Sequence, residues 1–178
     1  KRGADPTGLD LRAVLPVNLR PDDEVEQLGN RFGLVFLALP VGIADRGQRL
    51  RVLKERMDAI KDSAEAVVTY AILDAIGMTT PAIETQAVRF FGSKATAVMT
   101  NVPGPRQTLY LAGAPVRSIM FWVPQSARLG LGVSIISYAG EVRVGIVTDS
   151  GLVPDPDAIV AGFHEELHAM MADPAGFA

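Results

Sequence analysis

Hydrophobic residues recur at every second position in several stretches of the chain, and this spacing predicts strands. Residues 9–17 place their apolar side chains on one face. Residues 32–39 are almost wholly apolar, as expected of a strand buried on both faces. Residues 129–138 and 141–148 predict a hairpin that turns at Ala139 and Gly140. Three further strands are predicted at residues 95–99, 108–111 and 116–123.

Apolar residues spaced by three and four predict helices between these strands. Residues 47–76 have the pattern of one long amphipathic helix, which we expect to bend or break near residues 69–70. A shorter helix is predicted to start with Thr80 as its N-cap and Pro81 at its first position, and to end near residue 92.

A final helix is predicted to start after Asp155, with Pro156 at its first position. Its spacing predicts a buried face made of Ile159, Val160, Phe163, Leu167 and Met170. There is no internal repeat and no linker, so residues 1–178 are expected to form a single domain. We expect an α/β fold with a mixed, largely antiparallel sheet packed with helices.

Two features of the pattern predict local geometry. Residues 100–105, Thr-Asn-Val-Pro-Gly-Pro, predict a rigid polar turn between strands, because two prolines fix φ on either side of Gly104. This turn either faces a substrate or is only a tight connection. Gly130 and Gly132 leave one face of their strand bare, which indicates close approach of another backbone or of a ligand.

Composition narrows the class of protein. A hydrophobic fraction of 48% over 178 residues is typical of a folded domain with a sizeable core. The net charge of −3 gives no reason to expect nucleic acid as a partner. Without cysteine, the chain can have no disulfide, thiolate metal site or cysteine nucleophile.

Neither a membrane span nor a signal peptide is predicted. The longest uncharged run, residues 32–44, is shorter than the roughly 20 residues that cross a bilayer, and Pro40 interrupts it. Residues 1–6 contain no apolar signal core and no initiator methionine. The chain therefore has the character of a piece of a longer protein.

Residues 164–168, His-Glu-Glu-Leu-His, match the H-E-x-x-H pattern of zinc peptidases, in which Glu165 would be the base. These are the only two histidines, and ten residues follow them, so no later helix can supply a third ligand. We expect no metal here and interpret the segment as the solvated face of the last helix. The chain also lacks a G-x-S-x-G elbow, a dinucleotide fingerprint and a Walker phosphate loop.

The order of several short segments resembles the C-terminal domain of the bacterial wax ester synthase/acyl-CoA:diacylglycerol acyltransferase family. The resemblance runs from about residue 9 to 171. The segments are residues 12–20 (Arg-Ala-Val-Leu-Pro-Val-Asn-Leu-Arg), 29–32 (Gly-Asn-Arg-Phe), 100–105, 109–114 (Leu-Tyr-Leu-Ala-Gly-Ala), 137–140 (Ser-Tyr-Ala-Gly), 148–149 (Thr-Asp) and 153–155 (Val-Pro-Asp).

The resemblance implies one half of a fold similar to chloramphenicol acetyltransferase and to peptide-synthetase condensation domains. It also implies an O-acyltransferase that moves a fatty acyl group from acyl-CoA to diacylglycerol or a long-chain alcohol, with acyl-CoA as substrate and no further cofactor. The general base of this family lies in an H-H-x-x-x-D-G motif in the N-terminal half. This sequence has no His-His pair, so we expect no catalytic residue in this chain and inactivity without that half.

On this interpretation the chain forms one wall of a substrate channel between the halves. We expect Asn101, Pro103 and Gly104 at the channel mouth, with Asn101 either orienting a polar substrate group or capping its own turn. The remaining candidates are Arg106 and Arg128 for CoA phosphates, Gly113, Ala114, Met120 and Trp122 for the acyl groove, and Gln125 and Ser126 beside the reaction centre.

The resemblance leaves alternatives open. A non-catalytic lipid-binding or scaffolding domain of the same fold would have the same sequence pattern. In either case we expect a broad apolar surface that docks an N-terminal half or a second copy of the chain. A lipid substrate further implies a cytoplasmic protein with peripheral contact to the inner membrane or to lipid droplets.

Overall fold

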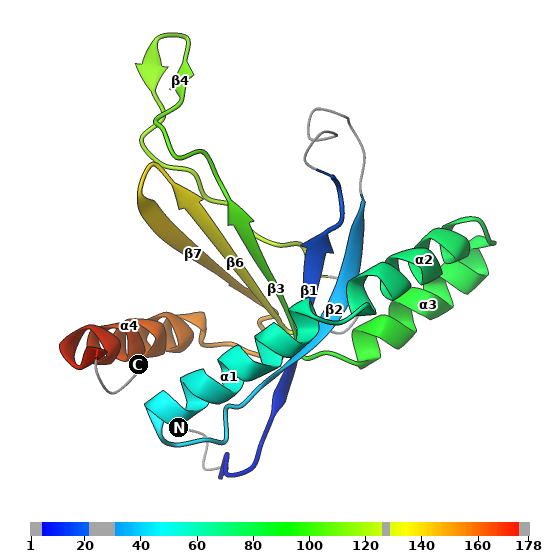
Figure 1. Ribbon diagram of the computed structural model, residues 1–178, viewed down its shortest axis with the longest axis horizontal. Coiled ribbons are helices and arrows are strands. Elements are labelled where there is room, and N and C mark those ends of the chain that lie inside the picture. The colour runs from blue at the N-terminus through cyan, green and yellow to red at the C-terminus, as the bar shows by residue number, and fades with distance from the viewer. Residues whose placement is uncertain (1–4, 22–30, 126–128, 175–178) are drawn as a thin grey trace.

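A computed structural model describes residues 5–21, 31–125 and 129–174 (Figure 1). Within these residues, two strands are followed by three helices, five strands and a final helix. In chain order they are β1 (Leu11–Asn18), β2 (Phe32–Leu39), α1 (Arg46–Lys61), α2 (Glu65–Gly77), α3 (Pro81–Ser93), β3 (Ala97–Pro103), β4 (Tyr110–Leu111), β5 (Ala114–Pro115), β6 (Leu131–Tyr138), β7 (Glu141–Thr148) and α4 (Pro156–Ala172).

The five longer strands form one mixed sheet in the order β2-β1-β3-β6-β7. The three inner strands are parallel, and each outer strand is antiparallel to its neighbour. This arrangement confirms the predicted α/β fold with a mixed sheet. The carboxyl ends of β1, β3 and β6 therefore lie at one edge of the sheet, from which the β4–β5 hairpin projects (Figure 1).

The two faces of the sheet are covered differently. On the face beneath α1 and α2 the register brings together the buried residues Ala13, Val35, Leu37 and Ala97. The opposite face carries a cluster made of Val14, Val98, Val123 and Leu129. Val123 belongs to the segment 116–125, which crosses this face in extended form without joining the sheet.

Helix α2 closes the outer edge of β2. The Thr69 hydroxyl accepts a hydrogen bond from Leu34 N (2.9 Å) and donates one to Leu34 O (2.7 Å). One turn earlier, Glu65 Oε1 accepts from Phe36 N at 2.8 Å. Unpaired strand edges invite association with other chains, so these side chains take the place of a sixth strand.

The predicted long helix is two helices, and its break lies earlier than expected. α1 ends at Lys61 and α2 begins at Glu65, not near residues 69–70. Ser63 causes the interruption, because its hydroxyl donates to Ile60 O and accepts from Glu65 N. Such local side-chain bonds compete with continuation of the helix.

Three other expectations require correction. Residues 116–123 form no strand, because they cross a sheet face where no neighbouring strand edge is available. β2 is an edge strand and not one buried on both faces, and Phe32 is 40% exposed. α4 begins at Pro156 as predicted, but Val160, Phe163 and Leu167 of its apolar face are about 40% exposed.

Gly33 tests the fit between α2 and the sheet edge. A Cβ at this position would overlap the backbone carbonyl of Ala66, so Gly33→Ala should lower the free energy of unfolding by at least about 2 kcal/mol. Gly162→Ala in α4 is the matched control, because a Cβ there meets nothing within 4 Å and should raise stability slightly. Urea unfolding of both variants measures this difference, and equal midpoints would contradict the close approach.

Candidate functional site

The Asn-Val-Pro-Gly-Pro motif is built into the sheet. Residues 100–103, expected in a turn, are the last residues of β3 and pair in register with residues 134–137 of β6. The chain leaves the strand at Gly104, whose N–H donates to Ser137 O at 3.0 Å. A Cβ on Gly104 would overlap that carbonyl, so the motif requires glycine for close approach of two backbones.

Tyr138, at the end of β6, fixes the segment that follows the motif. Its side chain is buried, with 3% exposed, and its hydroxyl accepts from Leu109 N (2.8 Å) and donates to Val116 O (2.7 Å). Leu109 and Val116 are the two roots of the β4–β5 hairpin and also bond to each other, at 2.8 Å. One phenol therefore anchors the hairpin to the sheet.

A cavity of about 380 Å³ lies where the motif meets the β6–β7 turn. Its lining consists of Gly104, Pro105 and Arg106 on one side and residues 137–142 on the other. Ala139 N donates to Pro105 O at 3.0 Å and joins the two sides. The cavity is at the carboxyl ends of the parallel strands, where open α/β sheets usually bind their ligands.

The structure brings four of the predicted residues together at this edge. Gly104 and Arg106 line the cavity, while Pro103 and Asn101 precede them on β3 and are exposed. The carboxamide of Asn101 has no hydrogen-bond partner among the described residues, so it does not cap its own turn. An exposed amide without a partner is available to a ligand.

The other candidates lie elsewhere. Gly113 and Ala114 are exposed at the tip of the β4–β5 hairpin, where Gly113 has a φ of 83°. The Gln125 amide donates to Val147 O on β7 at 3.2 Å, on the face that segment 116–125 crosses. Ser126 and Arg128 lie outside the described residues. The lining of the motif cavity does not include Gly113, Ala114 or Gln125.

Sequence reasoning missed Tyr138 and Ser134, although both belong to the alternating pattern of β6. Ser134 is 2% exposed, and its hydroxyl donates to Phe121 O at 2.5 Å. A Cβ on Gly132 would meet Val123 at 3.0 Å, so the bare face of β6 accommodates the chain's own segment. The close approach predicted from Gly132 is confirmed, and the neighbouring Trp122 is left 60% exposed.

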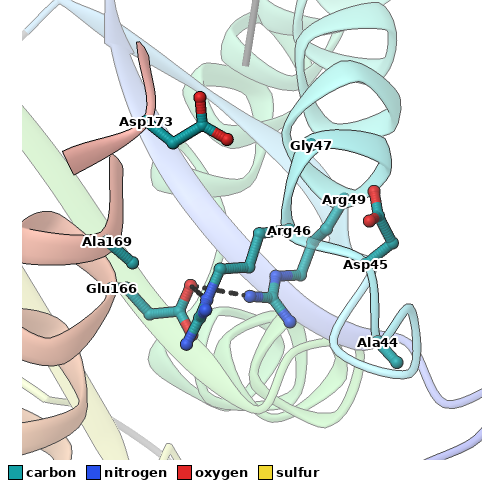
Figure 2. A pocket seen from close by; sticks show the side chains of 8 residues that line it. All are labelled: Ala44, Asp45, Arg46, Gly47, Arg49, Glu166, Ala169 and Asp173. Atoms are coloured by element: carbon teal, nitrogen blue, oxygen red, sulfur yellow. Dashed lines mark hydrogen bonds and ion pairs between the residues drawn. The ribbon is translucent and has the colours of Figure 1, made fainter. Parts of the chain in front are cut away.

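A second cavity, of about 560 Å³, separates α1 from α4 (Figure 2). Arg46 Nε and Arg49 Nη2, both on α1, reach Glu166 Oε2 of α4 across the gap, at 3.0 and 2.8 Å. Glu166 thus links α4 to α1 through two ion pairs. His164 and His168, whose ring centroids are 6.3 Å apart, are exposed on α4.

No three His, Asp or Glu side chains in residues 5–21, 31–125 and 129–174 are grouped so that they could hold a metal ion. Within the same residues, no helix has the length and apolar character that a membrane crossing requires.

Comparison with known proteins decides the family. Residues 28–171 match the family described as the WS/DGAT C-terminal domain. This chain belongs to that family. The match ends where the sequence resemblance does, at residue 171, and it includes the motif, the cavity and the β4–β5 hairpin.

Relatives of the WS/DGAT family are similar over nearly the whole chain. "Probable diacyglycerol O-acyltransferase tgs1" of Mycobacterium tuberculosis is 28% identical over 97% of this chain and 38% of its own length. "Wax ester synthase/diacylglycerol acyltransferase 11" of Arabidopsis thaliana is 28% identical over 91% of this chain and 36% of its own. The chain thus spans little more than a third of these relatives.

A solved structure supports the fold. The wax ester synthase/diacylglycerol acyltransferase from Marinobacter aquaeolei VT8 superposes with a TM-score of 0.57 at 19% identity. The superposition covers 89% of this chain and 36% of the Marinobacter protein. The chain therefore shares the fold of the matched part of the Marinobacter protein, which is of the chloramphenicol acetyltransferase type, as the resemblance implied.

The anchoring role of Tyr138 can be measured. Tyr138→Phe keeps the ring and removes both hydrogen bonds, so it should lower the free energy of unfolding by about 1–2 kcal/mol. Tyr110→Phe is the control, since Tyr110 is 69% exposed and should change stability by less than about 0.5 kcal/mol. Denaturant unfolding compares the variants, and equal losses would refute the assignment.

The contribution of the Glu166 ion pairs between α1 and α4 to stability should depend on salt concentration. Glu166 is partly exposed, so Glu166→Gln should cost only about 0.5–1 kcal/mol at low ionic strength. That cost should shrink in 1 M salt because of screening. Glu165→Gln, one residue away and exposed, should have no comparable effect. A loss that stays constant with salt would mean that packing, not charge, joins the helices.

Proposed function

We propose that this chain is the C-terminal half of an acyl-CoA-dependent O-acyltransferase. The enzyme would transfer a fatty acyl group to diacylglycerol or a long-chain alcohol, and this half would form one wall of the substrate channel. The family membership carries the proposal, because the relatives above are named for diacylglycerol and wax ester acyl transfer. The motif cavity at the carboxyl edge of the sheet supports its placement.

The exposed surface supports a half-molecule. The accessible surface is 12420 Å² for a mass of 19.0 kDa. A compact monomer of that mass is expected to expose about 8,400 Å². Large apolar side chains contribute to the excess on several elements: Val67, Val68, Ile72, Met78, Ile83, Phe90, Leu111, Trp122, Phe163 and Met171 are at least 43% exposed. Surface of this kind marks an interface.

Acyl transfer from a thioester to a hydroxyl needs a base to take the hydroxyl proton. The sequence holds two histidines, both on α4, and no H-H-x-x-x-D-G motif. We therefore assign the proton transfer to the N-terminal half. The role of this chain is to hold the substrates: Asn101 would orient a polar group at the channel mouth, and Arg106 would meet a CoA phosphate.

The proposed acceptors are lipids. We therefore place the enzyme in the cytoplasm, in peripheral contact with the inner membrane or lipid droplets, with acyl-CoA as substrate and no other cofactor. A lipid-binding or scaffolding domain of the same fold would share the exposed apolar surface. The sequence encoded immediately upstream separates the two, because an intact H-H-x-x-x-D-G supports the enzyme and a degraded one supports the scaffold.

The proposal predicts activity only when both halves are present. We expect this chain, co-expressed with an N-terminal half that carries H-H-x-x-x-D-G, to form ester from palmitoyl-CoA and diacylglycerol or hexadecanol. Asn101→Ala should lower kcat/KM about 10-fold without changing stability, because its exposed amide has no partner in the described part of the chain. Gln107→Ala, an exposed amide outside the cavity lining, is the control. A stable complex that makes no ester would refute the proposed enzyme.

A further inference from the structure

The β4–β5 hairpin is an arm that leaves the body of the domain. We define the arm as residues 109–116; its two short strands form a sheet of their own and do not join the five-stranded sheet. In Figure 1 it extends beyond the carboxyl edge of β3 and β6. A two-stranded hairpin by itself is only marginally stable in water, so its shape must be held from elsewhere.

The arm presents apolar side chains at its end. Tyr110 is 69% exposed, Leu111 is 75% exposed and Leu109 is 45% exposed. No residue from 107 to 116 carries a charge. Tyrosine is enriched among the residues that carry the binding energy of protein interfaces, and apolar side chains gathered on an exposed surface mark an interaction site. The absence of charge within the arm fits insertion into an apolar recess.

The arm is also stiff. Tyr138 bonds both of its roots, and Val116 N donates to Leu109 O between them. At the tip, Ala112 and Gly113 have φ of 49° and 83°, the conformation of a tight hairpin turn. Order that exists before association reduces the entropy lost on binding. A projection held at both ends in this way is suited to insertion into a partner.

We propose that the arm inserts into an apolar recess of the N-terminal half and fixes how the two halves meet. This inference rests on the proposed function and adds the contact surface to it. The arm begins three residues after Arg106, which lines the motif cavity. A half that delivers its base to that cavity must lie beside the arm, whereas a second copy of this chain has no such requirement.

The N-terminal half expected from the relatives is large enough to cover the exposed surface of this chain. The chain spans 38% of tgs1, so most of such a relative lies outside the matched region. The surface in excess of a compact monomer, about 4,000 Å², is more than the roughly 1,000–2,500 Å² that each partner of a permanent complex usually buries. A second copy or a lipid surface remains an alternative occupant that the experiment separates.

The test uses this chain co-expressed with an affinity-tagged N-terminal half. The variant Tyr110→Ser/Leu111→Ser should weaken association at least about 30-fold on dilution of the purified complex, as expected for two anchor residues. Leu9→Ser/Leu152→Ser is the control, since it removes apolar side chains that are 48% and 58% exposed but lie outside the arm and outside the apolar groups assigned above to the interface. Its affinity should stay within about threefold of the unmodified chain. Both variants should keep their unfolding midpoints.

Each other outcome has a defined meaning. Unchanged association of the arm variant overturns the inference, and so does failure of the unmodified halves to associate. The arm variant could instead lose a dimer of this chain, or lose binding to phosphatidylglycerol vesicles, while it keeps its affinity for the N-terminal half. Either result would assign the arm to a second copy or to a lipid surface, and it would overturn the inference. An arm-dependent complex that makes no ester supports the inference and refutes the acyltransferase. If the arm variant binds the N-terminal half with normal affinity and the complex forms ester, the result supports the acyltransferase and refutes the inference about the arm.

Discussion

The parallel pairing of β3 between β1 and β6 is the constraint on which the other features of the domain depend. It aligns three carboxyl ends at one edge, so the motif on β3 and the end of β6 arrive side by side. Gly104 can then approach the carbonyl of Ser137, and Tyr138 can reach both roots of the arm. Without this register, the motif, the cavity and the arm would have no fixed relation to one another.

Side chains hydrogen-bond to backbone groups in two places, at the β2 edge of the sheet and on the face that segment 116–125 crosses. At β2, α2 supplies Thr69 and Glu65, and Arg56 of α1 donates to Ala38 O at 2.7 Å while its guanidinium pairs with Asp10 at 3.0 Å. On the opposite face, Ser134 holds the carbonyl of Phe121. In both places a side chain forms a hydrogen bond with a backbone group that has no neighbouring strand to pair with, because buried polar groups require a partner. The sheet is thereby closed at its helix-covered edge.

The same sheet leaves its other elements incompletely covered. α4 reaches α1 mainly through the charges of Glu166, Arg46 and Arg49, and its apolar residues remain partly in solvent. The arm and the hairpin of α2 and α3 expose large apolar groups as well. An amphipathic element without a covering layer is stable only when something else buries it. This incompleteness is the physical reason for the proposal that the domain is part of a larger enzyme.

The sequence by itself determined the elements whose signals are local. Neighbouring residues are enough to predict the period of β1 and of the β6–β7 hairpin, the helix start at Thr80-Pro81 and the bare glycine face of β6. The order of the motifs identified the family. Other features depended on contacts between distant parts of the chain. The amphipathic pattern continues across Ser63, residues 116–123 alternate like a strand but have no edge to pair with, and Thr100 continues β3 only because Ser134 lies opposite. Tyr138 acquires its role from Leu109 and Val116, 29 and 22 residues away. Period and turn chemistry are encoded within a few residues, whereas pairing and burial are decided by which surfaces the folded chain brings together.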